Sequence, residues 1–330
     1  MSGREAFLKV EGLRVAFQGR DRPVTVLNDV SLSVARGETL GVIGESGCGK
    51  STLALAIMRL IRRPTGWIEA GTVTLDGVDL TALSESRMRS MRGNDLGMIF
   101  QEPLTSLNPV YTVGEQIGEV LRRHRGLSRR QARERAEELL RMLQIPDPGK
   151  RLDVYPYQLS GGMRQRVMIA IALACEPKLL LADEPTTALD VTVQAQIFDL
   201  LRDTRPEATA MILITHDFGA IAEMADRVAV MYAGRKIEEG PVRAIVSDAR
   251  HPYTQGLLRC VPEIEGGHTI ERGALPEIGG AVPSLANPPP GCPFAPRCPH
   301  RMDKCAVMPG AFRVGEDRTV SCWLAEETGA

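Results

Sequence analysis

The sequence predicts an α/β fold that is interrupted by a helical insertion and followed by a cysteine-rich appendage. In two stretches of the chain, short apolar runs typical of buried parallel strands alternate with helical patterns. Between these stretches, from about 102 to 160, the pattern is helical alone. Four of the seven cysteines fall in the last 40 residues, where proline is also frequent.

The N-terminal segments alternate apolar and polar residues with a period of two, which predicts antiparallel strands with one buried face. An apolar strand at 39–43 then runs into a glycine-rich turn, and 50–62 is expected to be a helix. The alternating apolar positions are Leu8 and Val10, then Leu13, Val15 and Phe17, then Val30, Leu32 and Val34.

The middle of the chain supplies one more strand, at 96–100, and then helices at 113–124 and 128–143. Ser128 and Gln131 have the spacing of a capping box at the start of the second helix. Buried strands are expected again at 178–182, 211–215 and 228–231. Past about 240 the regularity fades, and 276–309 is rich in proline and cysteine.

The composition argues against several classes of protein. With 43% hydrophobic and 25% charged residues, the chain is expected to be globular, and its net charge of −1 does not favour nucleic-acid binding. The N-terminus is polar, and the longest apolar run, 167–175, falls far short of the roughly 20 residues that span a bilayer. A membrane role would therefore require docking on another protein. The odd number of cysteines, without a signal peptide, favours a reducing compartment.

A phosphate-binding motif lies between the strand at 39–43 and the helix that follows it. The segment fits G-x-x-x-x-G-K-[ST], whose glycines let backbone N–H groups converge on phosphate oxygens. Lys50 is expected to reach the β- and γ-phosphates of ATP, and Ser51 to ligate Mg²⁺. A thiol at Cys48 could make the activity sensitive to alkylation. The motif residues are Gly44, Glu45, Ser46, Gly47, Cys48, Gly49, Lys50, Ser51 and Thr52.

Two carboxylates follow the apolar strand at 178–182, at the edge where open α/β sheets bind ligands. Asp183 is expected to hold Mg²⁺ through water, and Glu184 to orient and partly deprotonate the attacking water. Together with the phosphate loop, this pair strongly indicates an NTPase site, and these motifs alone leave many NTPases open.

The segment Leu159-Ser160-Gly161-Gly162-Met163 resembles the signature motif of ABC ATPases. Ser160 can cap the helix that follows, whose positive N-terminal end would face a phosphate. The resemblance implies a P-loop NTPase (RecA-like) ABC cassette with an N-terminal antiparallel β-subdomain and a helical subdomain at about 102–160. We expect this ABC ATPase domain to cover 1–250 and a C-terminal extension to cover 251–330.

Other motifs of the family follow in order. Gln101 resembles the Q-loop glutamine, which the family uses to touch Mg²⁺ and to sense the permease. Ala188-Leu189-Asp190 matches the D-loop, and His216 matches the switch histidine that contacts the γ-phosphate. Phe17 is the expected aromatic for stacking on adenine, although Tyr or Trp is commoner there. The resemblance also implies a dimer in which Ser160, Gly161 and Gly162 reach the γ-phosphate held by the partner subunit.

Longer segments resemble the ATPases of dipeptide and oligopeptide importers. They are MIFQEPLTSLNP at 98–109, LSGGMRQRVMI at 159–169, ADEPTTALDVTVQAQ at 182–196 and HPYT at 251–254. Met163 favours the D-type subunit over its F-type companion. The resemblance implies an unlike partner ATPase, two membrane permeases and an extracytoplasmic substrate-binding protein, with this chain peripheral on the cytoplasmic face of the cell inner membrane. Alternatives are a motor for nickel or another non-peptide solute, an exporter, and an ABC ATPase that acts on DNA or ribosomes.

Four cysteines of the appendage are separated by 5, 6 and 16 residues, without the C-x₂-C pairs common at structural zinc sites. Thiolates suit Zn²⁺ or an iron–sulfur cluster, and free thiols remain a third reading. The segment resembles the cysteine-containing region of peptide-importer ATPases, and this resemblance implies a [4Fe–4S] cluster. Its ligands would be Cys292, Cys298, Cys305 and Cys322.

Overall fold

A computed structural model of the chain describes residues 5–186, 190–260, 278–315 and 317–326. The chain divides into two compact units, each built from separate stretches of sequence. The first unit comprises Met1–Leu8, Val34–Thr39 and Thr74–Ile214, and the second comprises Lys9–Ser33, Leu40–Val73 and Thr215–Ala330. None of the helices in the described ranges is long and apolar enough to cross a membrane.

The first unit contains three parallel strands, β6 (Leu96–Ile99), β7 (Leu179–Asp183) and β8 (Ala210–Ile214), with β7 in the centre. Every residue of the three strands is buried. Apolar side chains on both faces are what a parallel strand covered on both sides requires, and this explains the continuous apolar runs in the sequence. The carboxyl ends of β6 and β7 therefore meet at one edge, where Ile99 pairs with Ala182.

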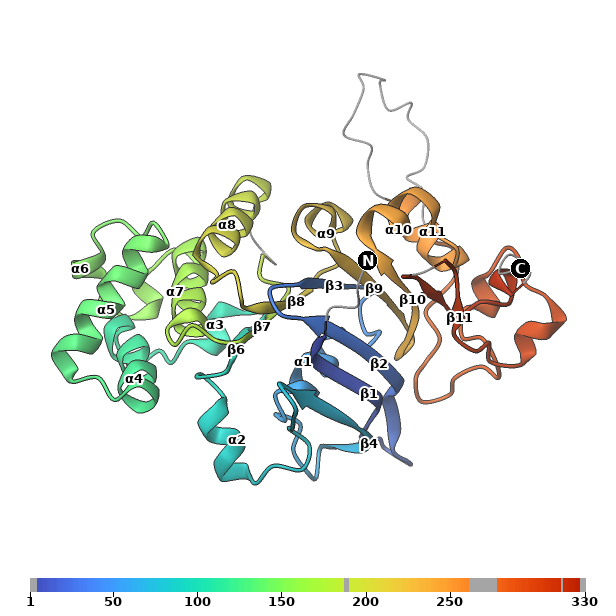
Figure 1. Cartoon of the computed structure of the whole chain (residues 1–330), viewed down its shortest axis with the longest axis horizontal. Helices are drawn as coiled ribbons and strands as arrows, with labels where there is room; N and C mark the ends of the chain where they lie inside the picture. The colour runs from blue at the N-terminus through green and yellow to red at the C-terminus, as the bar shows by residue number, and fades with distance from the viewer. Residues whose placement is uncertain (1–4, 187–189, 261–277, 316, 327–330) are drawn as a thin grey trace, which may run out of the picture. The chain divides into compact units, whose positions relative to one another are not determined.

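The helical part of the first unit is drawn in green in Figure 1. α4 (Val113–Arg125) and α5 (Arg129–Met142) pack on each other and on α7 (Gly161–Leu173). The predicted helices at 113–124 and 128–143 are thus confirmed, and so is the capping box of Ser128 and Gln131. The remaining elements of the unit are the long helix α8 (Val191–Thr204) and several short ones: β5 (Val78–Asp79), α2 (Glu85–Met91), α3 (Pro103–Ser106), α6 (Pro148–Arg151) and the 3₁₀ turn Pro156–Gln158.

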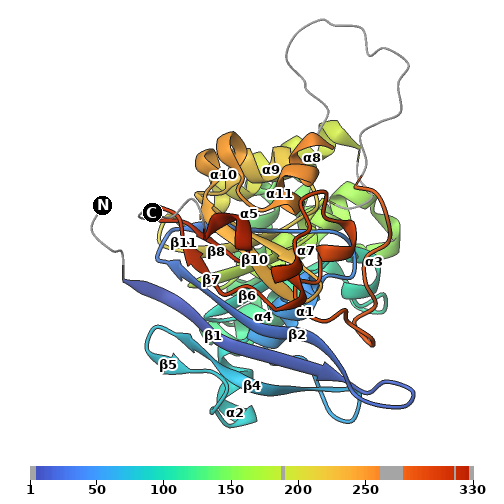
Figure 2. The ribbon, with the colours of Figure 1, turned by 90° about the vertical axis from the view of Figure 1, so that its right-hand side faces the viewer.

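Most of the N-terminal β-subdomain lies in the second unit, where Figure 2 shows the long strands β1 and β2 above β4. β1 (Ala6–Phe17) is one continuous strand, although the sequence suggested two shorter ones. β2 is Val24–Ala35 and β4 is Gly66–Leu75. α1 (Lys50–Ile57) ends five residues before the predicted boundary at 62, because Arg59 adopts a left-handed conformation (φ 50°) that a helix cannot continue through.

The second unit also holds a mixed sheet in which β3 (Thr39–Ile43) runs parallel to β9 (Arg227–Tyr232). β10 (Arg235–Pro241) pairs antiparallel with β9, and β12 (Thr319–Val320) pairs with the other edge of β10. No pattern in the sequence had predicted β10 or β12. Further elements of this unit are α9 (Phe218–Met224), α10 (Val242–Asp248), α11 (Pro252–Arg259), β11 (Phe312–Arg313) and the 3₁₀ turns Ala295–Arg297, Asp303–Ala306 and Trp323–Ala325.

Candidate functional site

The predicted phosphate loop connects β3 to α1 in the second unit, and two of its glycines are sterically required. A Cβ at Gly44 would stand 2.2 Å from the carbonyl oxygen of Met231 in β9. Gly49, the residue before α1, has φ 103°, a left-handed conformation that L side chains rarely adopt. The loop therefore turns tightly against β9, and the first turn of α1 follows it directly.

Lys50 is anchored within this loop. Its side-chain amine donates hydrogen bonds to the carbonyl oxygens of Gly44 (2.7 Å) and Glu45 (3.2 Å). The residue is only 6% exposed, so its ammonium group is held in the loop and does not move freely in solvent. Ser51 and Thr52, the next two residues of α1, are half-buried, while Ser46 and Gly47 are exposed at the tip of the loop.

In the first unit, the structure brings Gln101 and Glu184 together. The side-chain amide of Gln101, just beyond β6, donates a hydrogen bond of 3.0 Å to Oε2 of Glu184, just beyond β7. Glu184 has φ 46°, an uncommon conformation for a residue other than glycine, and its N–H is bonded to the carbonyl of Ile214. Asp183, the last residue of β7, is 4% exposed. Strained backbone at a carboxylate is a feature of functional sites.

His216 lies close to the start of the phosphate loop. The N–H of Thr215 donates to the carbonyl of Val42 in β3 (3.2 Å), so the exposed His216 follows at the strand end from which the loop departs. Phe17 ends β1 and is half-buried, with its ring so near Gly66 that a side chain there would collide with it. The role of Phe17 in stacking on adenine stays a prediction.

The tip of the signature segment is exposed in the first unit. Ser160 caps α7 by accepting a hydrogen bond from the N–H of Met163 (3.4 Å), as its position before the helix predicted. Ser160 and Gly161 are exposed, and a Cβ at Gly161 would meet no atom within 4 Å. Gly162 is half-buried and faces the side chain of Val193 in α8.

The D-loop is only partly visible. Ala188 and Leu189 lie outside the described residues. Asp190 is the N-cap of α8, where its carboxylate accepts a hydrogen bond of 2.9 Å from the N–H of Val193. This capping explains an aspartate at that position without any nucleotide. Its role between two nucleotide sites therefore stays a prediction.

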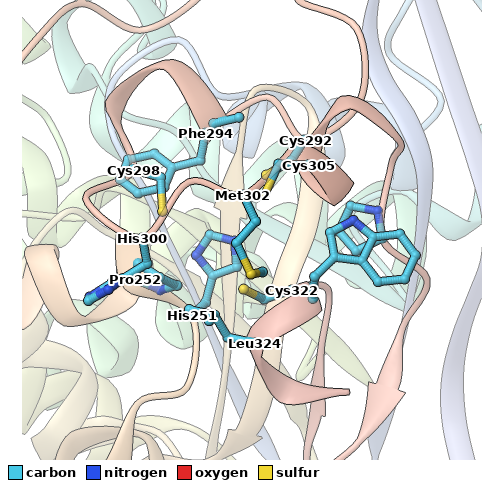
Figure 3. Close-up of a pocket in the computed structure, with 13 residues that line it drawn as sticks. His251, Pro252, Cys292, Phe294, Cys298, His300, Met302, Cys305, Cys322 and Leu324 are labelled. Carbon is cyan, nitrogen blue, oxygen red and sulfur yellow. The ribbon is translucent and has the colours of Figure 1, made fainter. Parts of the chain in front are cut away.

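The four cysteines of the appendage line one pocket in the second unit (Figure 3). Burial raises the pKa of Cys322 to about 11 and also raises the pKa values of the Cys292 and Cys298 thiols. In the ranges that the structure describes, however, no three His, Cys, Asp or Glu side chains are arranged so that they could hold a metal ion. The structure thus gathers the four predicted ligands around one space without giving them ligand geometry.

One further polar side chain lines this pocket. His251 is 1% exposed, and its Nδ1 accepts a hydrogen bond from the N–H of Tyr253 (3.0 Å). Nε2 is buried and has no hydrogen-bond partner among the described residues, although the ring lines the cysteine pocket. Burial lowers the pKa of His251 to about 3, so its ring is neutral and carries its proton on Nε2. A buried N–H donor beside four thiols would suit a bound group that carries acceptor atoms.

Sequence reasoning missed the contacts that the C-terminal segment makes with the phosphate loop. The guanidinium of Arg297 pairs with the carboxylate of Glu45, and the hydroxyl of Tyr253 accepts a hydrogen bond from the N–H of Glu45. Partners that are more than 200 residues apart leave no local pattern in a sequence. Only the basic character of 297–304 hinted that this segment has an electrostatic role.

The structure argues against the expectation that Cys48 makes the protein sensitive to alkylation. The residue is 1% exposed, and burial raises the pKa of its thiol. Because the thiolate is the reactive form, both effects protect the side chain.

We therefore predict that iodoacetamide at neutral pH labels the exposed Cys260 well before Cys48. Mass spectrometry of peptides from the native, alkylated protein measures the two rates. Unfolding in urea should remove the difference between the two sites. Equal labelling in the native state would contradict the burial of Cys48.

Comparison with known proteins agrees with this geometry. The ABC transporter family matches residues 27–187, and the family described as "Oligopeptide/dipeptide transporter, C-terminal region" matches residues 237–305. A putative peptide import ATP-binding protein of Brucella abortus (strain 2308) is 51% identical over 99% of both chains. The dipeptide transport ATP-binding protein DppD of Bacillus subtilis (strain 168) is 47% identical over 98% of this chain and 96% of its own.

Solved structures give the same result for the cassette. The ATP-binding cassette MJ0796, in a dimeric post-hydrolysis state bound to ADP and Pi, matches with a TM-score of 0.64 and 30% identity, over 72% of this chain and 99% of that chain. The predicted fold class, an α/β ABC cassette, is thereby confirmed. The phosphate loop, the carboxylates at the carboxyl end of β7 and these relatives together show that the chain belongs to the ABC ATPases, within the family of peptide import ATP-binding proteins.

Proposed function

We propose that this chain is the subunit that hydrolyses ATP to drive a membrane importer of dipeptides or oligopeptides. The observation that carries the hydrolytic part is the hydrogen bond from the Gln101 amide to the Glu184 carboxylate at the end of two buried parallel strands. The peptide substrate class is supported by the near full-length similarity to ATP-binding proteins that are named for peptide, dipeptide and oligopeptide transport. The similarity at 237–305 to the C-terminal region of such transporters supports it as well.

In this proposal the predicted site residues have separate roles in hydrolysis. Lys50 and the N–H groups of the phosphate loop bind the β- and γ-phosphates. Ser51, Gln101 and, through water, Asp183 would hold Mg²⁺, which would neutralise phosphate charge. Glu184 accepts a proton from water as the water oxygen attacks the γ-phosphorus and the bond to the ADP oxygen breaks. The Gln101 amide holds the Glu184 carboxylate in one orientation, and the exposed His216 contacts the γ-phosphate.

The proposal includes a second subunit because the N-terminal end of α7, at the signature motif, is exposed and can contact another chain. Ser160 and Gly161 are exposed, and their helix end carries the positive end of the α7 dipole. We propose that Ser160, Gly161 and Gly162 bind the γ-phosphate held by a partner ATPase, an unlike F-type homologue. Two permease subunits and an extracytoplasmic binding protein complete the complex, and the chain works peripherally on the cytoplasmic face of the cell inner membrane.

We also propose that Cys292, Cys298, Cys305 and Cys322 ligate a [4Fe–4S] cluster. Their convergence on one pocket supports this, and so does Nε2 of His251, which has no hydrogen-bond partner in the part of the chain that the structure describes. Within that part, the present arrangement of the cysteines lacks ligand geometry. Such a cluster would supply a redox-active or structural centre to the C-terminal segment. The division into an ABC ATPase domain at 1–250 and an extension at 251–330 remains part of the proposal.

For the catalytic base, we predict that Glu184→Gln retains MgATP binding but slows ATP hydrolysis by about 10²-fold or more, because the amide cannot accept the proton of the attacking water. Single-turnover hydrolysis of radiolabelled ATP by the assembled transporter measures the rate. Glu207→Gln, which alters an exposed carboxylate of the same unit, is the matched control and should not change it. Unchanged turnover in Glu184→Gln would remove Glu184 from this role.

For the partners, we predict that the tagged chain, purified from detergent-solubilised membranes, brings two permeases and one unlike ATPase with it. Uptake into cells that lack this chain should fall for labelled dipeptides and oligopeptides and should be restored by the unaltered chain. Loss of nickel uptake with normal peptide uptake would favour the nickel motor. Recovery of nucleic acid or ribosomes in place of permeases would contradict transport.

For the cysteine pocket, we predict that protein purified without oxygen is brown and contains about four iron atoms per chain, as a [4Fe–4S] cluster requires. Elemental analysis and the visible absorption spectrum measure this. Cys298→Ser should lose the iron, whereas Cys260→Ser, which alters an exposed cysteine outside the pocket, should keep it. Zinc, or no metal, in the unaltered protein would contradict the cluster.

A further inference from the structure

Glu45, the second residue of the phosphate loop, is contacted by two side chains from the C-terminal part of the second unit. Arg297 makes two parallel hydrogen bonds to its carboxylate, from Nη1 to Oε2 (2.7 Å) and from Nη2 to Oε1 (3.0 Å). The backbone N–H of Glu45 donates a hydrogen bond to the hydroxyl of Tyr253 (2.8 Å). The side chain and the backbone N–H of Glu45 are therefore both bound by residues that are more than 200 positions away in the sequence.

Contacts other than the one with Glu45 also hold Arg297 in place. Its side chain is only 4% exposed, which is unusual for arginine outside a built site. Its guanidinium also donates hydrogen bonds to residues outside its own turn, and these bonds orient the side chain towards Glu45. The acceptors are the carbonyl oxygens of Gly279 (2.9 Å) and Ile278 (2.8 Å) and the hydroxyl of Tyr232 (3.2 Å).

The charge of this pair matters because of where it lies. The Glu45 side chain is 26% exposed and belongs to the loop that binds the phosphates of ATP in our proposal. An unpaired carboxylate there would repel a polyanion across a short distance, in surroundings that screen less than bulk water. A bidentate guanidinium cancels this charge and fixes its position, as a lysine could not do equally well.

The segment that carries Arg297 forms part of the wall of the cysteine pocket, because Phe294, Ala295 and Cys298 line it. Arg297 closes the 3₁₀ turn Ala295–Arg297, and Cys298 is the next residue. Phe294, which is labelled with Cys298 in Figure 3, packs its ring edge-on against the rings of Tyr232 and Tyr253. A change in this turn would move the guanidinium as well as the wall of the pocket.

We propose that Arg297 is a positioning residue for the phosphate-binding loop: by pairing with Glu45 it sets the affinity for MgATP and makes this affinity depend on the C-terminal segment. The proposal rests on the proposed role of the loop in ATP binding. If the ion pair served only to stabilise the fold, loss of either partner would lower the stability of the protein without a specific effect on its affinity for MgATP.

The test is equilibrium binding of MgATP to the full chain, measured by isothermal titration calorimetry for four proteins: unaltered, Arg297→Gln, Glu45→Gln and the double variant. Arg297→Gln leaves the Glu45 carboxylate unpaired and should raise the Kd about tenfold. Adding Glu45→Gln removes that charge and should return the Kd to within about twofold of the unaltered value, a non-additive result. Arg301→Gln, which alters an exposed arginine of the same segment, is the matched control and should change nothing.

Two further measurements keep the outcome decisive. If Arg297→Gln does not fold, as judged by thermal unfolding, Arg297→Lys carries the same test with a smaller expected rise in Kd of about threefold. Lys50→Ala should abolish binding if the loop is the ATP site, whatever Arg297 does, so failure of the proposed function can be distinguished from failure of this inference. An unchanged Kd in Arg297→Gln, or a double variant that binds more weakly than Arg297→Gln, would overturn the proposal.

Discussion

The tight passage of the phosphate loop past β9 is the constraint on which the rest of the nucleotide chemistry depends. No side chain fits at Gly44, because the carbonyl of Met231 occupies the place of a Cβ. Since β3 and β9 are paired in parallel, this contact fixes the start of the loop relative to the sheet. The carboxyl end of β3 then determines the positions of Lys50, His216 and the first turn of α1.

Local signals made part of this architecture predictable. The continuous apolar run of β7 and the glycines of the phosphate loop each depend on neighbours a few residues away, and so does the capping box of α5. The exposed tip at Ser160 could be inferred because a helix cap is a local device. Within the candidate site, the hydrogen bond between Gln101 and Glu184 was not predicted, although each residue follows one of two strands that pair in the sheet.

What the sequence concealed depends on contacts between distant segments. β12 has two residues and exists because β10 offers it an edge, so no periodicity could reveal it. The end of α1 was placed too late because the apolar pattern continues past Arg59, where the backbone turns left-handed. The ion pair between Glu45 and Arg297 joins two residues that, taken singly, are ordinary charged residues in loops.

The strand β12 has a consequence for shortened versions of this protein. β10 has β9 on one side, and on the other side Glu238 and Glu239 pair with Val320 and Thr319. Removing the last dozen residues would uncover backbone N–H and C=O groups along that edge and would also strip cover from two buried carboxylates. An uncapped strand edge recruits other chains, so such a truncated protein is expected to self-associate even if its cassette still folds.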